Sequence, residues 1–249
     1  MTYRALLGHA FHAFKRNLNL ILFLSIPLLI SLPLAFFLPN FVSLSGIFLR
    51  FSSVGLDLSF LDALFFIVLV LVSLVLFSFA IAAINVVIKS QRRLVKLNGE
   101  DLADIETGTF KLFYIYLLAF TVIFAVNLLL FEHNVQGIAF IGARSIGMLF
   151  ALIVSLIVLF APQAVTIDDL SVSQALDRSI TTIFRHFNFF VFFLLFAGVL
   201  LIANTVLFLE LGKAIPFARH LSLVTNALII LPFLEALKTE IYLSKYKLL

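Results

Sequence analysis

The sequence predicts an all-α, polytopic integral membrane protein with six transmembrane helices and interfacial amphipathic helices. Three observations favour this fold class. First, 63% of the 249 residues are hydrophobic and only 12% are charged, whereas soluble domains carry about a quarter charged residues. Second, the apolar residues form long continuous runs. Third, the basic residues between these runs fall predominantly on one side of the predicted membrane.

A soluble fold of this length has too little polar surface to cover so many apolar side chains. Lipid removes that constraint, and only helices or closed barrels satisfy backbone hydrogen bonds within lipid. A barrel requires short strands in which apolar and polar residues alternate. The apolar runs here are continuous and long, so we expect helices.

Each transmembrane helix needs roughly 20 apolar residues to cross a hydrocarbon core of about 30 Å. The basic stretch Met1–Arg16 precedes a long apolar run that contains prolines and no small-residue cleavage site, which favours an uncleaved first span. The predicted spans are 18–38, 60–88, 110–131, 138–161, 187–209 and 221–242.

The orientation follows from the distribution of lysine and arginine, which are enriched in cytoplasmic segments. Six spans place both termini on the same side together with the segments after the second and fourth spans. That side collects thirteen basic residues, and the other side has four: Arg50, Arg144, Lys213 and Arg219. We therefore expect a multi-pass protein of the cell membrane with cytoplasmic N- and C-termini.

The chain is predicted to form a single transmembrane domain, 1–249, with candidate repeats at 1–88, 99–162 and 171–242. A phenylalanine followed by a basic residue opens each odd-numbered span, and amphipathic stretches precede the first and fifth. Such stretches favour interfacial helices. The alternative is that this residue pair recurs by chance at membrane entries. The acidic segment before the third span is a poorer candidate for such a helix.

Basic residues near the cytoplasmic interface are candidates for contact with a partner protein or with membrane lipids. The segment 89–108 is basic in its first half and acidic in its second. A solvated loop is the alternative interpretation. The candidate contact residues are Lys89, Arg92, Arg93, Lys96, Arg178 and Arg185.

The sequence contains no motif that predicts an enzyme. There is no GxxxxGK[ST] loop, HExxH pair or GxSxG elbow. The absence of cysteine excludes disulfides and thiolate metal sites. His9 and His12 lie three residues apart but lack acidic companions, and the adjacent Asp168 and Asp169 favour a turn over a metal site. We therefore predict no catalytic residue, no cofactor and no metal.

Polar residues within the spans are the main candidates for function, because burying them in lipid is costly. Four asparagines (Asn85, Asn127, Asn204 and Asn226) lie within predicted spans, where a bond between helices is the structural alternative. Glu235 follows Pro232 in the sixth span, and a proline-loosened helix beside a carboxylate resembles transporter ion sites. The competing interpretation is that Glu235 pairs with Lys238 and snorkels to the interface.

One stretch resembles a known group of proteins. Residues 161–168 (APQAVTID), followed by Ser173-Gln174-Ala175-Leu176 and Ser179, resemble six-span families that include the YciC-like proteins. The membrane domain attached to some glycerophosphodiester phosphodiesterases is similar. The resemblance covers about 20 residues and implies the six-span fold with a helix leading into the fifth span. It implies no active residue.

Three functions are compatible with this sequence. The first is a non-enzymatic accessory or scaffold component that acts through lipids or a partner protein. The second is a transporter or permease subunit for a small or lipophilic molecule, with Ser171–His186 as a coupling helix for a separate ATPase subunit. The third, a lipid-modifying enzyme, needs an interfacial cluster of His, Asp or Glu that the sequence barely provides. No pattern indicates nucleic-acid binding or a particular oligomeric state.

Overall fold

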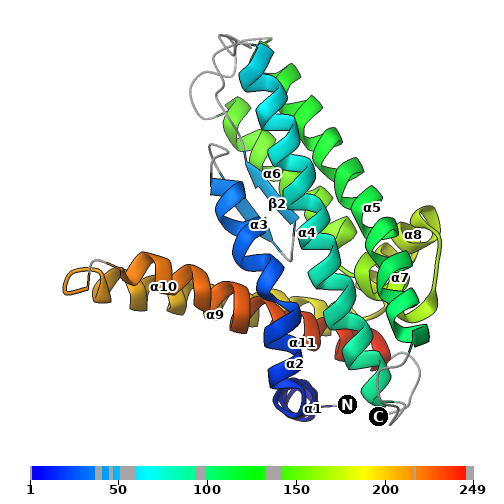
Figure 1. Ribbon diagram of the computed structural model, residues 1–249. Helices are drawn as coiled ribbons and strands as arrows, with labels where there is room; N and C mark the ends of the chain where they lie inside the picture. Colours follow the sequence, from blue (N-terminus) through cyan, green and yellow to red (C-terminus); the bar gives the residue numbers. More distant parts are fainter. Residues whose placement is uncertain are drawn as a thin grey trace.

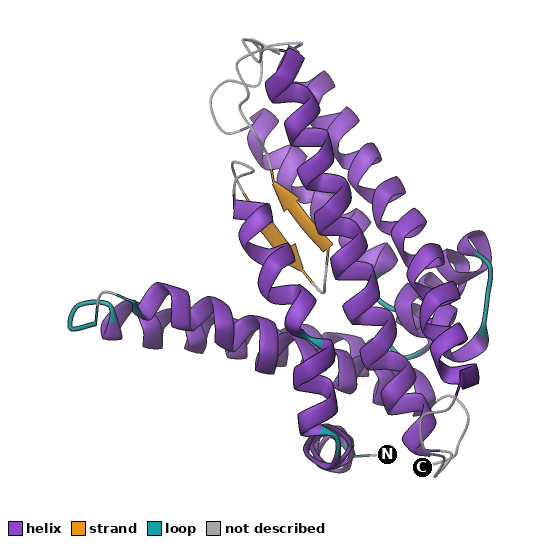
Figure 2. Ribbon diagram, in the orientation of Figure 1, coloured by secondary structure: helices purple, strands orange, loops and turns teal. Residues whose placement is uncertain are grey.

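The computed structural model describes the backbone of residues 2–36, 41–44, 47–50, 60–92, 99–132, 142–215 and 217–244. Side chains are described for 2–31, 64, 67–90, 99–126, 146–215, 217, 218 and 220–244. The described chain is overwhelmingly helical (Figures 1 and 2). It contains five helices that are long and apolar enough to cross a membrane, or six if the bent pair at the N-terminus forms one span. The predicted all-α membrane architecture is confirmed.

The helices form two arms that run crosswise to each other (Figure 1). The first arm contains the elongated helices α3 (Ile26–Phe36), α4 (Phe60–Arg92), α5 (Gly99–Glu132) and α6 (Gly142–Val158). Within it, α4 packs along α3 and α5, and α5 packs on α6. Helix α4 is therefore the central element of this arm.

The second arm is a helical hairpin of α9 (Phe187–Leu211) and α10 (Ala218–Thr225). The side-chain amide of Asn204 on α9 donates to Ser222 Oγ on α10 at 2.9 Å, which ties the two helices together inside an otherwise apolar arm. At the tip, Lys213 pairs with Glu210 at 2.6 Å, and both side chains are exposed. Asn204 and Ser222 therefore lie between the two helices of this arm, and an exposed ion pair lies at its tip.

The first predicted span is not one straight helix. Helix α1 (Tyr3–Arg16) ends at Asn17 and precedes α2 (Leu18–Leu24), and the axis bends by 77° between Tyr3–Arg16 and Leu18–Ser31. A second break, at Ser25, separates α2 from α3, where Pro27 lacks the N–H that a continuous helix would need. Helix α1 consequently lies across the direction of the helices that follow it.

The sixth predicted span is interrupted as well. Helix α10 passes into a π-helical turn, η1 (Asn226–Ile230), before α11 (Leu231–Leu243). Pro232 at the start of α11 removes one backbone donor, and a π turn is one way in which a helix accommodates such a disturbance. Isolated π turns also occur frequently at functional sites.

The fourth predicted span breaks at Leu159 and Phe160, between α6 and the short helix α7 (Ala161–Asp168). Pro162 lies in the first turn of α7, where its missing N–H has no cost. Asp169 ends α7 in the left-handed region (φ 52°), a conformation that aspartate tolerates better than most residues. Helix α8 (Val172–Arg185) then begins with a capping box formed by Ser171 and Gln174.

The third predicted span is part of a longer helix than expected. Helix α5 begins at Gly99, ahead of the predicted boundary at Phe110, and carries Glu100 and Asp101 in its first turn. Acidic residues at this position stabilise the positive end of the helix dipole. Residues 99–110 therefore extend the span instead of forming a separate interfacial helix like α1 or α8. The internal repeat stays a prediction.

A short antiparallel hairpin lies beside the first arm and was not predicted. Strand β1 (Phe41–Leu44) pairs with β2 (Ile47–Arg50), with Phe41 opposite Arg50 and Leu44 opposite Ile47. With four residues in each strand, it is far too short to span a membrane. The architecture remains a helical one.

Gly108 lies where α5 packs against α4 and α7. A Cβ atom at this position would lie 3.5 Å from Thr166 Cγ2 and 3.6 Å from Ala82 Cβ, both ordinary contacts. We expect Gly108→Ala to leave the fold intact and to raise helix stability by up to about 1 kcal/mol. Gly108→Leu should instead destabilise the protein by about 1–3 kcal/mol through overpacking. Thermal unfolding in detergent checks that Gly108→Ala is more stable than Gly108→Leu. Equal stabilities of the two variants would contradict the close packing of α5 around Gly108.

Candidate functional site: a buried polar cluster

The two arms meet around α11, which is the most enclosed helix of the described chain. Every side chain from Leu234 to Leu243 is buried, including three charged ones. Helices α1, α4, α7 and α9 pack around it, and Figure 1 shows it at the junction of the arms. Lysine and glutamate are almost never fully buried unless they are paired. The polar residues of α11 therefore require partners, and the neighbouring helices provide them.

Glu235 and Lys238 form an ion pair inside this junction. Glu235 Oε1 lies 2.6 Å from Lys238 Nζ, and their side chains are only 4% and 0% exposed. The ammonium also donates to the backbone carbonyl of Leu159 at 3.2 Å. That carbonyl lies at the break between α6 and α7, where the end of a helix leaves carbonyl groups without intrahelical partners. The ion pair thus connects α11 to the interruption of the fourth span.

The second oxygen of Glu235 accepts bonds from two amide side chains on other helices. Gln163 Nε2 on α7 lies 3.1 Å from Glu235 Oε2, and Asn85 Nδ2 on α4 lies 3.4 Å from it. Asn85 Oδ1 in turn accepts from Gln163 Nε2 at 3.1 Å and from Thr239 Oγ1 at 2.6 Å. The five residues Asn85, Gln163, Glu235, Lys238 and Thr239 are called the polar cluster below.

Local sequence determines how each element reaches the cluster. The turn at Leu159 and Phe160 redirects the chain so that α7 can approach α4, and the N–H of Phe160 donates to Ser179 Oγ at 3.0 Å. On α11, a spacing of three and four residues from Glu235 places Lys238 and Thr239 on the same helix face. Asn85 Nδ2 also donates to the carbonyl of Ile81 at 2.9 Å, which fixes its orientation on α4.

Two buried polar atoms, one in the cluster and one near it, lack a hydrogen-bond partner among the described residues. They are Gln163 Oε1 and the hydroxyl of Tyr116 on α5. Tyr116 is 1% exposed, packs its ring edge-on to Phe77, and lies close enough to Glu235 to interact with it electrostatically. An internal water with several polar neighbours is the usual way in which such groups are satisfied.

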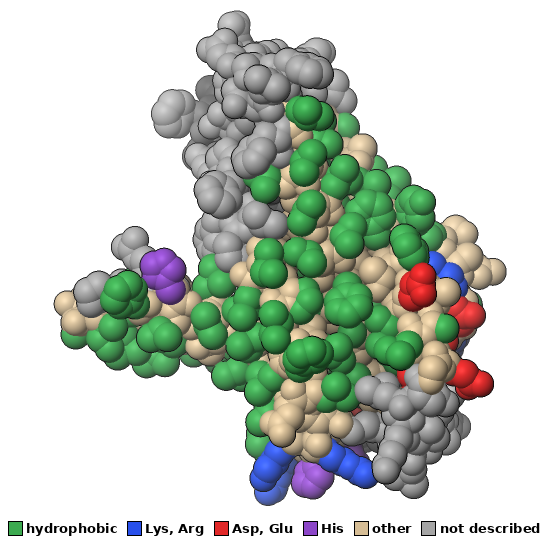
Figure 3. All heavy atoms as spheres, in the orientation of Figure 1, with side chains coloured by type: hydrophobic (Ala, Val, Ile, Leu, Met, Phe, Trp, Pro, Cys, Tyr) green, Lys and Arg blue, Asp and Glu red, His purple; other side chains and the backbone are tan. Residues whose placement is uncertain are grey.

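A second set of polar and charged contacts lies at the end of α7 and at the turn between α7 and α8. Lys89 on α4 donates to the carbonyl of Thr166 at 2.8 Å and pairs with Asp104 at 3.0 Å. Tyr242 on α11 donates to Asp168 at 2.6 Å. Lys111 on α5 pairs with Asp169 at 2.6 Å. Helices α4, α5 and α11 are therefore tied to one turn, and the acidic side chains gather on this side of the molecule (Figure 3).

The structure brings together only some of the residues singled out by the sequence. Glu235 and Asn85 belong to the polar cluster, whereas Asn204 lies in the second arm. Asn226 begins the π turn, and its Oδ1 atom is buried without a partner in the described part of the chain. The side chains of Asn127, Arg92, Arg93 and Lys96 lie outside the described residues.

The candidate contact residues on the described helices divide into two groups. Lys89 is largely enclosed by its partners, and Arg178 Nε lies 4.0 Å from Asp168 Oδ2. Arg185, in the last turn of α8, is exposed.

The snorkelling interpretation of Glu235 and Lys238 is wrong, because the pair forms but both side chains are buried. Neighbouring helices supply enough polar groups to hold the charges inside.

Sequence reasoning did not single out Gln163, Thr239 or Tyr116 as site residues. Gln163 follows Pro162 in an otherwise apolar segment, and that isolated amide is a signal that could have identified it. Thr239 and Tyr116 carry no such signal, because threonine and tyrosine occur routinely in membrane helices. Their role depends on which helices meet, and a single sequence does not specify that.

Within the polar cluster the carboxylate of Glu235 is fully satisfied, whereas Gln163 Oε1 has no hydrogen-bond partner among the described residues. Both carboxylate oxygens of Glu235 have partners, and its charge is balanced by Lys238. No group of three or more His, Cys, Asp or Glu residues suited to a metal occurs in the part of the chain that the structure describes. This arrangement can hold helices in register, and it can move a charge only if the ion pair opens.

Comparison with known proteins finds no matching family model, no matching curated protein and no matching solved structure.

Proposed function

We propose that this chain is a non-enzymatic scaffold of the cell membrane whose two arms are held together by the polar cluster. In this role it acts through surrounding lipids or through a partner protein. The observation that carries the proposal is the closed state of Glu235, whose carboxylate is occupied by groups from α4, α7 and α11. A buried ionic network of this kind contributes specificity of arrangement more readily than net stability.

The outer surface of the arms supports a role within lipid. On α9, Leu195, Val199 and Ile202 are each 66% exposed and recur at helical spacing. Apolar side chains are spread widely over the coloured surface of both arms (Figure 3). The bias of basic residues to one side of the spans favours a cytoplasmic position for α1, the α7–α8 turn and the end of α11.

A second candidate function, transport of a small or lipophilic molecule, is favoured by a different observation. The ion pair lies just after the π turn and Pro232, where the helix backbone is irregular. Gln163 bonds to Glu235 and Tyr116 interacts with it electrostatically, and Gln163 Oε1 and the Tyr116 hydroxyl have no hydrogen-bond partner in the described part of the chain. Broken helices with a nearby charge form the ion sites of many transporters. In a transporter of this kind, the Glu235 carboxylate would leave its ion pair with Lys238 and bind a transported proton or cation instead.

One double variant separates the two functions. Glu235→Gln combined with Lys238→Met removes both charges but keeps an acceptor for the amides of Gln163 and Asn85. We expect the double variant to fold with a stability within about 1.5 kcal/mol of the wild type, because neutral replacements of buried ion pairs are often tolerated. Thermal unfolding in a mild detergent checks this expectation.

The functional readouts are co-purification and proton flux. Affinity purification of the tagged wild-type protein, with mass spectrometry, identifies stoichiometric proteins and lipids. A scaffold should retain the same companions in the double variant. Proteoliposomes containing a pH-sensitive dye and an imposed proton gradient test the transporter. Flux in the wild type that disappears in the folded double variant would reject the scaffold proposal in favour of transport.

A further inference from the structure

Helix α1 presents a basic face that is directed away from the rest of the protein. Its apolar face is buried, with Leu6 and Ala10 fully enclosed and Phe14 packed edge-on to Phe233 of α11. Tyr3 stacks on Phe192 of α9 with ring centroids 4.9 Å apart. The helix is thus attached to both α11 and α9, and its opposite face is exposed among the described residues.

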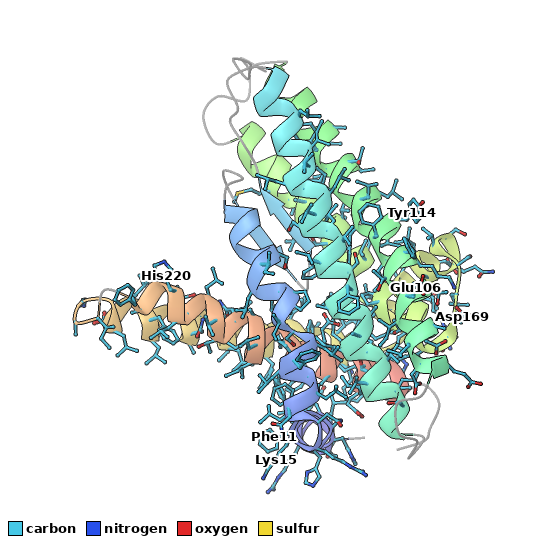
Figure 4. All side chains as sticks on the ribbon, in the orientation of Figure 1. Phe11, Lys15, Glu106, Tyr114, Asp169 and His220 are labelled. Atoms are coloured by element: carbon cyan, nitrogen blue, oxygen red, sulfur yellow. The ribbon has the colours of Figure 1, made fainter. Side chains whose placement is uncertain are left out.

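The exposed face combines positive charge with one large apolar side chain. Its basic members are Arg4, Lys15 and Arg16, accompanied by His9 and His12, and all five are exposed. There is no acidic residue between Thr2 and Asn17. Phe11, which is 55% exposed, lies one turn from Lys15, and both point outward at the end of the molecule (Figure 4).

We propose that this face of α1 binds the headgroups of anionic phospholipids, with Phe11 inserted at the boundary between headgroups and acyl chains. The 77° bend after α1 turns the helix across the direction of α2 and α3, as expected for a helix lying in the membrane interface. Basic side chains near an anionic leaflet attract it electrostatically. A phenylalanine among basic residues has a favourable position in lipid but an unfavourable one in water.

This inference does not rest on the proposed scaffold function, because the basic face lies on the opposite side of α1 from α11 and the polar cluster. A peripheral acidic protein could match the charges, but it would not require the exposed Phe11 on the same face. The phospholipid accounts for both the charges and the aromatic residue.

The test uses the full chain in an uncharged detergent, titrated with phosphatidylglycerol or with phosphatidylcholine of identical acyl chains. Native mass spectrometry gives the apparent affinity for each lipid. The wild type should prefer phosphatidylglycerol, and 1 M salt should weaken that preference. The triple variant R4Q/K15Q/R16Q should lower the preference by on the order of 100-fold, and Lys15→Gln alone by about fivefold.

Matched variants separate lipid binding from effects on the fold. Lys213→Gln at the tip of the second arm should leave the preference unchanged, since that exposed lysine already pairs with Glu210. Phe11→Ser should weaken binding of both lipids about tenfold without altering their ratio. All variants should melt within about 4 °C of the wild type, because the changed side chains are exposed. A wild type without headgroup preference, or a triple variant that retains it, would overturn the proposal.

Discussion

Replacing Glu235 alone with glutamine should cost about 3–5 kcal/mol of folding free energy, because Lys238 would remain buried without a counter-charge. Lys238 is 0% exposed and has no carboxylate other than Glu235 within salt-bridge distance among the described residues. The Leu159 carbonyl offers it a partial charge only. The melting temperature in detergent should fall by on the order of 10 °C. Lys238→Met should have a similar effect for the complementary reason.

The double variant E235Q/K238M provides the control for this prediction. If the cost arises from an uncompensated charge, the double variant should be more stable than either single variant. The exposed pair of Lys213 and Glu210 offers a second control, since Lys213→Gln should change the stability by no more than about 1 kcal/mol. Costs at 235 and 238 that simply add together would show that the two residues act independently and would contradict the buried ion pair.

The helical membrane architecture could be predicted from the sequence because it depends on local properties. Long apolar runs determine where spans lie, and these runs are visible without knowledge of their neighbours. Helix α9 (Phe187–Leu211) accordingly begins at the predicted residue and ends within two residues of the predicted boundary at Leu209. The amphipathic stretches before the first and fifth spans are likewise separate helices, α1 and α8.

The interruptions of the spans were less predictable because they depend on tertiary contacts. Pro232 indicated a disturbance, and Pro27 and Pro162 lie beside two other interruptions, but a proline in a membrane helix can give a kink, a π turn or a complete break. At Leu159 and Phe160 the break is supported from a distance, by Ser179 and Lys238. Partners so far apart in the sequence cannot be identified from the residues around the break alone.

The candidate site was predictable only in part, because its contacts join residues that are far apart in the sequence. Glu235 was identifiable because a carboxylate within an apolar run is rare and costly. Its partners Asn85 and Gln163 lie 150 and 72 residues away in the chain. Their convergence requires α4, α7 and α11 to meet, and hydropathy does not encode which spans are neighbours. The burial of Lys238 follows from that convergence, since without it the side chain would extend to the interface.

The second large effect concerns Asn85, whose amide is the one neutral group that contacts Gln163, Thr239 and Glu235 together among the described residues. Asn85→Asp is nearly isosteric but introduces a second carboxylate about 3.4 Å from Glu235 Oε2, where Asn85 Nδ2 now lies. Two carboxylates cannot both ionise at such a separation without strong repulsion. We expect a loss of about 3 kcal/mol or more in unfolding free energy, whereas Asn85→Leu should cost about 1–3 kcal/mol through lost hydrogen bonds alone.

Combining Asn85→Asp with Glu235→Gln tests whether charge balance governs the cluster. Each substitution alone leaves one uncompensated charge, negative in the first and positive in the second. The double variant contains one carboxylate and one ammonium again, with the carboxylate moved from α11 to α4. Its stability loss should therefore be smaller than the sum of the two single losses by at least about 2 kcal/mol, which a double-mutant cycle of unfolding free energies in bicelles would measure. If the two single losses of unfolding free energy simply add in the double variant, hydrogen-bond geometry and not charge balance determines the stability of the polar cluster.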